Sequence, residues 1–282
     1  INVWLDAAGN ASIVASDLDN GSNDNCSVPV LSASKTSFTC ADLGANTVIL
    51  SATDQAGNSS TCSSIVTVID TVSPTASCQN INAFLDGTGS ISISSSDIDN
   101  GSSDNCGTTT ASLSKSVFSC IDEGANVVTM TITDGSGNTS TCSATVTVID
   151  SVSPSASCQN LTVYLDGAGN ASITTADINN GSSDNCSISS IDLDKTSLNC
   201  SNEGVNTVVR TIRDQANNSS TCSAIVTVVD TTSPNAISQN INLYLNASGT
   251  ATITANDLDN GSSDNCSIAN LTLDKYNFTC AE

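Results

Sequence analysis

The chain has 282 residues, with 28 acidic side chains, 6 basic side chains and no histidine, so its formal net charge is −22 at pH 7. This charge excludes nucleic acids and anionic membranes as partners, because binding to phosphate depends on lysine and arginine. No apolar run approaches the roughly 20 residues that a membrane-spanning helix needs, so we expect no membrane insertion.

A ten-residue stretch rich in Asp and Asn recurs at a fixed interval. It reads DLDNGSNDNC at residues 17–26, DIDNGSSDNC at 97–106, DINNGSSDNC at 177–186 and DLDNGSSDNC at 257–266. This period of 80 residues indicates that each copy is one domain of a tandem array. We predict repeat domains at residues 1–73, 74–153, 154–233 and 234–282. The first and last are expected to be incomplete, since the sequence starts and stops within a period.

The second copy shows the pattern of strands. Ile81, Ala83 and Leu85 share one face of a first strand, and the turn at 87–89 predicts a hairpin with residues 90–94. Further strands are predicted within residues 109–118 and at 127–134 and 140–150. Segments rich in Val, Ile and Thr predict an all-β fold of tandem immunoglobulin-like antiparallel β-sandwich repeats, with six or seven strands each. One proline per linker, at 74, 154 and 234, stiffens the connections and predicts a rod-like array.

Aromatic residues recur at two positions of the repeat. One set lies in the first strand: Trp4, Phe84, Tyr164 and Tyr244. The other lies before the second cysteine of a repeat: Phe38, Phe118 and Phe278. We expect both sets in the core or at its edge. Sugar-binding modules need exposed aromatic platforms, and this chain has few aromatics to supply them.

The 13 cysteines indicate a disulfide framework, because they lack the Cys-x-x-Cys pairs of zinc sites and no histidine accompanies them. Disulfides persist outside the cytosol, so the sequence predicts a secreted or cell-surface protein in the extracellular space.

Two pairing schemes fit the spacing of the cysteines. In the first, the predicted bridges are Cys26–Cys40, Cys106–Cys120, Cys186–Cys200, Cys266–Cys280, Cys78–Cys142 and Cys158–Cys222. In the second, Cys62 pairs with Cys78 and Cys142 pairs with Cys158, which leaves Cys222 opposite Ser238. We favour the first scheme, because it leaves only Cys62 unpaired, and we expect the mate of Cys62 two residues before the sequence begins. The second needs a free thiol inside an oxidised array.

The recurring stretch offers oxygen ligands of the kind that calcium binds. The candidates are Asp17, Asp19, Asn20, Asp24 and Asn25 in the first copy, Asp97, Asp99, Asn100, Asp104 and Asn105 in the second, Asp177, Asp184 and Asn185 in the third, and Asp257, Asp259 and Asp264 in the fourth. Asn179 replaces one carboxylate, so the third site is expected to be the weakest. The alternative is that these residues form turns and cap a short helix, with Gly21 and its counterparts at positive φ.

A second calcium site is conceivable between domains. Asp54, Asp134 and Asp214 lie in turns, and Asp70, Asp150 and Asp230 lie at strand ends, where they could meet as in cadherins. The TDxxGN pattern, found at residues 53–58 and 133–138, is also typical of plain turns.

Several motifs of the second copy resemble a known module. They are CQNI at 78–81, DNC at 104–106, GANVV at 124–128, TDGSGN at 133–138 and CSATVTVID at 142–150. Together they resemble the hyalin-type (HYR) repeat, an extracellular immunoglobulin-like module. Long Ser- and Thr-rich arrays of such repeats are similar to the giant SprB-type surface adhesins of gliding Bacteroidetes. The resemblance implies a role in adhesion or as a surface filament, and export by a type IX-like secretion system.

The linkers contain a second motif that resembles one in exported Bacteroidetes proteins. Asp70-Thr71-Val72, Asp150-Ser151-Val152 and Asp230-Thr231-Thr232 are similar to the sites at which Bacteroidetes O-glycosylate exported proteins. This resemblance implies a glycoprotein modified at Thr71, Ser151 and Thr231. The alternative is a strand end followed by a polar linker.

The function predicted from these features is the stalk or fibre of a bacterial surface adhesin, without catalytic activity. No unique nucleophile or acid–base pair stands out, since every carboxylate candidate recurs from repeat to repeat. The expected partners are neighbouring repeats of the same chain, and surface glycans or other cells bound through domains outside this segment. The alternative is an accessory or spacer module of a secreted polysaccharide-degrading enzyme.

Overall fold

The computed structural model describes residues 1–281. The chain forms two compact units, one spanning Ile1–Asp150 and the other starting at Ser151. We use repeat 1 to repeat 4 for the four predicted domains, so the first unit holds repeats 1 and 2 and the second holds repeats 3 and 4.

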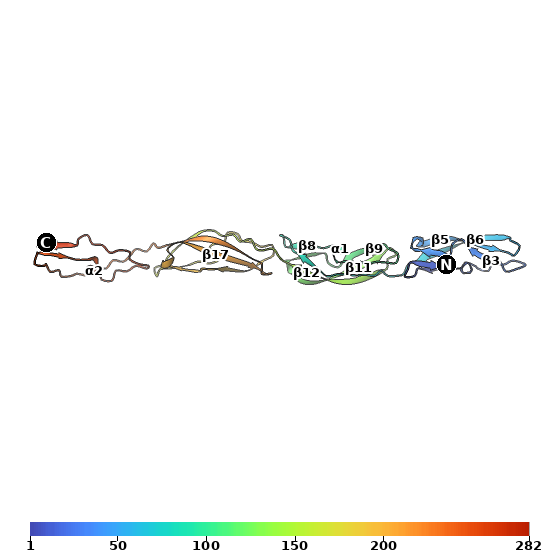
Figure 1. Cartoon of the computed structure of the whole chain (residues 1–282), viewed down its shortest axis with the longest axis horizontal. Coiled ribbons are helices and arrows are strands. Elements are labelled where there is room, and N and C mark those ends of the chain that lie inside the picture. Colours follow the sequence, from blue (N-terminus) through green and yellow to red (C-terminus); the bar gives the residue numbers. More distant parts are fainter. Residues whose placement is uncertain (282) are drawn as a thin grey trace. The chain divides into compact units, whose positions relative to one another are not determined.

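Repeat 2 is a sandwich of two sheets, and its strands β8, β9, β11 and β12 are labelled in Figure 1. One sheet has the order β7-β12-β11-β9, with β7 at Ile81–Phe84, β12 at Thr139–Ile149, β11 at Gly124–Asp134 and β9 at Thr109–Leu113. The other pairs β10 (Val117–Ser119) with β8 (Ser90–Ser92). A helical turn α1 (Ser95–Ile98) and a 3-10 turn η3 (Cys120–Asp122) complete it. This arrangement confirms the predicted all-β, immunoglobulin-like repeat.

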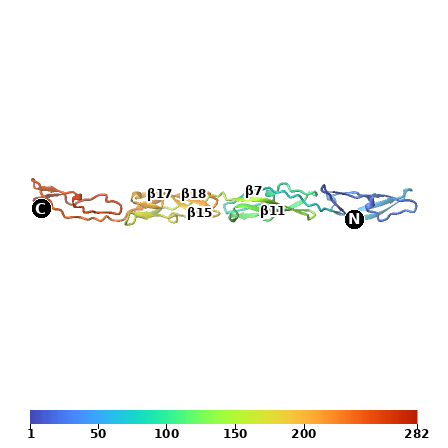
Figure 2. The same cartoon turned by 90° about the horizontal axis from the view of Figure 1, so that it is seen from below.

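Repeats 1 and 3 have the same arrangement. Repeat 1 contains β1 (Asn2–Trp4), β2 (Asn10–Ser12), η1 (Ala15–Asp17), β3 (Val30–Ala33), β4 (Ser37–Thr39), η2 (Cys40–Asp42), β5 (Gly44–Thr53) and β6 (Ser59–Ile69). Repeat 3 contains β13 (Leu161–Tyr164), β14 (Asn170–Ser172), β15 (Ile188–Leu193), β16 (Ser197–Asn199), η4 (Cys200–Asn202), β17 (Gly204–Asp214) and β18 (Ser219–Val229). Figure 2 shows β15, β17 and β18 side by side.

Repeat 4 contains fewer regular elements among the described residues. They are β19 (Thr250–Thr252), α2 (Ala255–Leu258) and β20 (Asn277–Thr279), with β19 and β20 paired. Two further bridges join Asn235 to Ser263 and Ser238 to Asp259. No helix in residues 1–281 has the length and apolar character needed to cross a bilayer.

The predicted hairpin at the start of the repeat is wrong. Strand β7 runs parallel to the last strand β12, with Ile81 opposite Val146, while β8 pairs with β10 in the other sheet. The turn between them therefore carries the chain from one sheet to the other. Asp86 fixes this turn, because its Oδ1 accepts hydrogen bonds from the backbone of Thr88 (2.8 Å) and Ser90 (3.1 Å).

The core of repeat 2 follows the period-2 pattern of the long strands. Val128, Met130 and Ile132 on β11 are buried, as are Ala144, Val146 and Val148 on β12. Phe118 and Ile98, both fully buried, close the core from the second sheet and from α1.

The two aromatic sets differ in burial, and Phe278 of the second set is half-buried. Phe38 and Phe118 are 1% exposed, as predicted. The first-strand set is exposed instead: Trp4 by 58%, Phe84 by 53%, Tyr164 by 63% and Tyr244 by 85%. The prediction of a core role for this set is wrong, because the strand buries the alternate residues, such as Ala83 and Leu85, and turns the aromatic outward.

Repeat 3 carries an arginine inside its core. Arg210 occupies the position of Met130 and is 1% exposed. Its Nη1 donates to Oδ1 of Asn179 (2.9 Å) and to Oγ of Ser182, and its Nε has no hydrogen-bond partner among the described residues. Burial lowers the pKa of this guanidinium below its ordinary value.

Candidate functional site

The disulfides place the candidate site at the junction between repeats. The two long bridges form as predicted, Cys78–Cys142 within repeat 2 and Cys158–Cys222 within repeat 3. The short-loop bridges Cys26–Cys40, Cys106–Cys120, Cys186–Cys200 and Cys266–Cys280 do not form. Instead Cys40 of repeat 1 is bonded to Cys106 of repeat 2, and Cys200 of repeat 3 to Cys266 of repeat 4. Cys120 and Cys186 are also disulfide-bonded, whereas Cys26, Cys62 and Cys280 are free and exposed.

The length of the repeat explains why the short-loop bridges are wrong. Asp134, at the end of β11, lies opposite Thr109, so Cys106 lies at that end of the repeat. Cys120 precedes Gly124, where β11 begins, and therefore lies at the opposite end. Ten residue steps along β11 separate the two ends by about 33 Å, whereas a disulfide needs Cα atoms within about 7 Å. Cys40 lies at the end of repeat 1 that meets repeat 2, and its Cα is 5.2 Å from that of Cys106.

The first half of the recurring stretch stabilises its own repeat. Oδ2 of Asp97 accepts hydrogen bonds from the backbone N–H (2.7 Å) and Oγ (2.8 Å) of Ser94 and so caps α1. Asp17, Asp177 and Asp257 accept the equivalent backbone bond in the other repeats. These bonds match the alternative of a capped helical turn. The bonds from Ser94 hold the pKa of Asp97 below its ordinary value.

The middle of the stretch forms a turn. Oδ1 of Asp99 accepts from the N–H of Ser102 (3.1 Å), and the Ser102 hydroxyl and backbone together keep the pKa of Asp99 low. Asn100 binds Ser77 through its backbone N–H and leaves its side chain exposed. Gly101 takes the predicted positive φ, +82°. Neither Asp97 nor Asp99 joins a metal-sized group of His, Cys, Asp or Glu in residues 1–281.

The second half of the stretch reaches the preceding repeat. Nδ2 of Asn105 donates to the backbone oxygen of Asp6 (3.2 Å) and to Oδ1 of Asp70 (3.3 Å), both in repeat 1. Oδ2 of Asp104 accepts from the N–H of Cys106 (2.9 Å). Ligand atoms of Asp70, Asp104 and Cys106 lie within 4.8 Å of one another.

The turn at residues 134–138 joins the same junction. Nδ2 of Asn138 donates to Oδ2 of Asp134 (2.8 Å) and to the backbone oxygen of Asp70 (3.2 Å). Burial raises the pKa of Asp134, but hydrogen bonds from Asn138 and neighbouring backbone N–H groups outweigh it and leave the pKa below its ordinary value. The two calcium hypotheses drawn from the sequence, one for the loop and one for strand ends and turns, thus converge on one place.

Several buried oxygens of the junction have no hydrogen-bond partner among the described residues. They are Oδ2 of Asp70, Oδ1 of Asp104 and Oδ1 of Asn105. Asp70 is only 5% exposed, although it carries a carboxylate. An arrangement of this kind supplies oxygen ligands for a cation.

The second unit repeats the asparagine contacts between repeats 3 and 4, although Asp230 and Asp264 are not among the metal-sized groups of the described residues. Nδ2 of Asn265 donates to the backbone oxygen of Asp166 (3.0 Å) and to Oδ1 of Asp230 (3.1 Å). Oδ1 of Asp264 and Oδ1 of Asn265 are again buried without a hydrogen-bond partner.

Repeat 1 has a hollow at the end that corresponds to the Asp104 end of repeat 2. Asp24, Asn25 and Cys26 line a shallow hollow together with Asp54 and Asn58, the counterparts of Asp134 and Asn138. Asp24, Asn25 and Cys26 are exposed, whereas Asp104, Asn105 and Cys106 are half-buried against repeat 1. The hollow therefore corresponds to the part of repeat 2 that lies against Cys40 and Asp70 of repeat 1.

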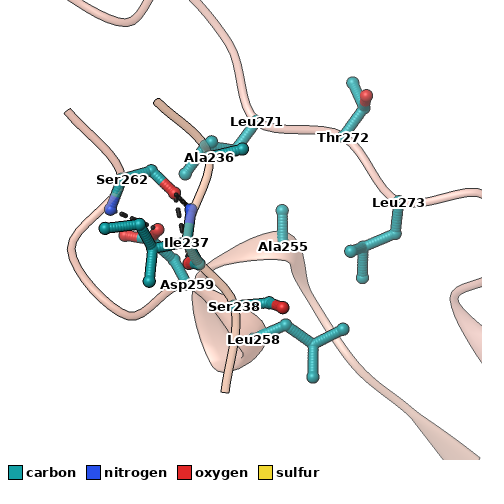
Figure 3. A pocket seen from close by; sticks show the side chains of 10 residues that line it. All are labelled: Ala236, Ile237, Ser238, Ala255, Leu258, Asp259, Ser262, Leu271, Thr272 and Leu273. Carbon is teal, nitrogen blue, oxygen red and sulfur yellow. Dashed lines mark hydrogen bonds between the residues drawn. The ribbon is translucent and has the colours of Figure 1, made fainter. Parts of the chain in front are cut away.

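A pocket in repeat 4 lies away from the junction (Figure 3). Ser238, Leu258, Leu271 and Leu273 line it, and a network of Ile237, Asp259 and Ser262 closes one side. The counterparts of Ser238 and Leu273 in repeat 2 are Cys78, bonded to Cys142, and Leu113, paired with Met130. The pocket is thus the part of the core that β11 and β12 cover in repeat 2, and we assign it no ligand.

The proposed glycosylation positions are accessible. Thr71, Ser151 and Thr231 are all exposed. The preceding Asp70 has a structural role of its own, since its Oδ1 accepts from the N–H of Val72 (3.1 Å) as well as from Asn105.

No protein-family model matches this sequence, and no curated protein matches it. Solved structures of tandem β-domains do match. Protocadherin gamma B7 extracellular cadherin domains 1–4 align with a TM-score of 0.34 and 14% identity, over 89% of this chain and 80% of that chain. Titin domains I67–I69, in an E-to-A variant, align with a TM-score of 0.36 and 10% identity, over 81% of this chain and 95% of that chain. Mouse cadherin-23 EC22–24 aligns with a TM-score of 0.30 and 14% identity, over 65% and 74%.

Proposed function

We propose that the chain is a non-catalytic, load-bearing segment of an extracellular stalk or fibre, of the kind that carries a bacterial surface adhesin. The observation that carries this proposal is the covalent bridge between consecutive repeats, Cys40–Cys106 in one unit and Cys200–Cys266 in the other. A pull along the chain passes through these bridges, so the residues that they enclose bear no tension. A stalk with this design transmits force with little extension.

Forced extension of single oxidised molecules tests the mechanical part. The loop closed by Cys40 and Cys106 spans 66 residues, which amounts to about 220–240 Å of extended chain. We expect this length to be released only after reduction. Release of the full loop without reductant would contradict a load-bearing role.

Surface labelling tests the biological part. Antibodies against the repeats are expected to label intact cells, and removal of repeats is expected to weaken attachment to surfaces. The proposal includes export by a type IX-like system and kinship with SprB-type adhesins, which the motif resemblance supports. It also includes contact with glycans or cells through domains outside this segment. Label confined to the cytoplasm would refute the proposed surface location.

Calcium and glycans are further parts of the proposal. Calcium is supported by the grouping of Asp70 and Asp104 and by the charge of −22. Glycans at Thr71, Ser151 and Thr231 are supported by the exposure of all three hydroxyl-bearing residues.

The accessory-module alternative is favoured by one observation. Each repeat exposes one first-strand aromatic, for example Phe84 and Tyr164, and exposed aromatic rings can stack on sugars. Affinity electrophoresis in gels that contain soluble polysaccharides tests it. Retardation that is lost on Trp4→Ala, Phe84→Ala and Tyr164→Ala substitution would favour this alternative, and unretarded migration would remove it.

A further inference from the structure

We propose that the junction between consecutive repeats binds a calcium ion, held by Asp70 at the end of one repeat and by Asp104 and Asn105 of the next. This inference deepens the calcium part of the proposed function and names the atoms involved. It does not depend on the adhesive role.

The unpaired oxygens are the first argument. Oδ2 of Asp70, Oδ1 of Asp104 and Oδ1 of Asn105 are buried, and none has a hydrogen-bond partner in residues 1–281. Buried polar atoms in folded proteins are satisfied in the great majority of cases. Three such acceptors in neighbouring side chains, drawn from two repeats, indicate a shared partner that the described residues do not supply.

The charge of the site is the second argument. Two carboxylates lie within 4.8 Å of each other, and that of Asp70 belongs to a side chain that is 95% buried. Like charges at this separation repel, and a buried charge without a counter-charge is strongly destabilising. Lys35 pairs with Asp42 and Lys115 with Asp122, so neither of these lysines neutralises Asp70 or Asp104. A bound cation would remove both penalties.

The ligand chemistry selects calcium among the common cations. Cys106 is bonded to Cys40 and offers no thiolate, so the donor set consists of carboxylate and amide oxygens. Calcium accepts such hard oxygen ligands in irregular geometry and completes its shell with water. Asp134 adds negative charge at the same junction through Asn138.

The site recurs independently of the first unit. Asn265 donates to Asp230 as Asn105 donates to Asp70, and the Oδ1 atoms of Asp264 and Asn265 are again buried without a partner in residues 1–281. The hollow of repeat 1, by contrast, is lined by Asp24 and Asn25 without an aspartate from another described repeat. Asp24 is therefore a matched control within the same chain.

Calorimetric titration of CaCl2 into the full, oxidised, metal-free chain tests the proposal. Asp104→Asn is expected to reduce the number of bound ions by one, and so is Asp264→Asn. The asparagine keeps an oxygen that can accept from the Cys106 N–H, so the loop can still close. Asp24→Asn is expected to leave the stoichiometry unchanged. Absence of binding at 10 mM CaCl2, or a loss of sites in Asp99→Asn but not in Asp104→Asn, overturns the assignment.

Asn105→Asp separates a metal site from a purely structural contact. The added carboxylate replaces the N–H donor to Asp70, so we expect this variant to melt at a lower temperature than wild type without calcium. With calcium we expect tighter binding, by several-fold, and recovery of the melting temperature. A variant that stays equally destabilised with and without CaCl2 contradicts the proposal, even if Asp104→Asn fails to fold. Calcium binding by a chain that proves not to be surface-exposed would refute the stalk while leaving this site intact.

Discussion

Cys40 and Cys106 belong to different repeats and lie 66 residues apart in the sequence, yet a disulfide joins them with their Cα atoms 5.2 Å apart. The bond closes a loop that contains both long strands of repeat 1, the linker and the first two strands of repeat 2. Consecutive repeats are thereby crosslinked at the point where Asp70 meets Asp104.

Removal of this bridge should destabilise the junction. Closure of a 66-residue loop contributes about 4 kcal/mol in the chain-entropy treatment, so Cys40→Ser/Cys106→Ser is expected to lower the free energy of unfolding by up to that amount. Urea unfolding measures the loss. Cys26→Ser is the control, because Cys26 is free and exposed. A non-reduced peptide map that links Cys106 to Cys120 would contradict the structure directly.

Gly9 is expected to be essential for close approach at the junction. A Cβ at this residue would lie 2.7 Å from Sγ of Cys40 and 3.1 Å from the backbone oxygen of Asn105, and φ is +74°. Gly57 has a similar φ of +89° but nothing within 4 Å. We expect Gly57→Ala to cost about 1 kcal/mol from backbone strain, and Gly9→Ala to cost about 1–3 kcal/mol more from the clash. Thermal unfolding compares the two, and equal losses would show that the clash is relieved without cost.

Replacement of the buried arginine should stabilise repeat 3. Arg210→Met installs the residue that repeat 2 uses at the same place, Met130, and removes a buried charge with no carboxylate partner. We expect a gain of about 1–3 kcal/mol, because replacing buried charge by well-packed apolar groups is often stabilising. Arg213→Met, at an exposed position of the same strand, is the control. Denaturant unfolding that shows Arg210→Met to be destabilised would mean that the guanidinium contacts with Asn179 and Ser182 outweigh its desolvation.

The capping aspartates should make the protein acid-sensitive. Hydrogen bonds hold the pKa values of Asp97, Asp177 and Asp257 below the ordinary value. A lowered folded-state pKa means that the stabilisation is complete above the unfolded-state pKa of about 3.9 and is lost as the pH falls through the folded-state value. The melting temperature should therefore be flat from pH 8 to 5 and fall below about pH 4. The triple Asp→Asn variant at these positions should show a shallower fall, and an identical acid profile would count against the capping role.

Glycosylation of the linkers is checked on material from the native cell. Peptides that contain Thr71, Ser151 or Thr231 are expected to carry glycan mass, because these residues are exposed and follow Asp. Peptides from the strands, where Ser and Thr alternate with buried residues, serve as the internal control. Bare linker peptides at all three positions would remove this part of the proposal.

Part of what was missed was available in the sequence. The alternation in residues 81–85 that places Ile81, Ala83 and Leu85 on one face also places Phe84 on the other, which is the exposed face. The core position predicted for Phe84 rested on its aromatic character, whereas its place in the alternation already indicated the exposed face. The arginine at 210 was equally visible, as the one copy in which a charged residue replaces the Met130-type core position.

The sequence by itself determined the local and periodic features of this protein. Period-2 alternation is a local pattern, so it predicted the buried faces of β11 and β12. The 80-residue period defined the repeats, and the loop chemistry indicated turns, caps and oxygen ligands. Only the tertiary structure decided which end of one repeat faces which end of the next. Cys106 and Cys120 are close in sequence but lie at opposite ends of a strand about 33 Å long, whereas Cys40 and Asp70 are brought to Cys106 and Asp104 by the packing of one repeat against the next. Spacing along the chain carries no information about that packing. For this reason the sequence assigned the disulfide and the candidate calcium ligands to the loop of one repeat, whereas the structure places them at the junction between two repeats.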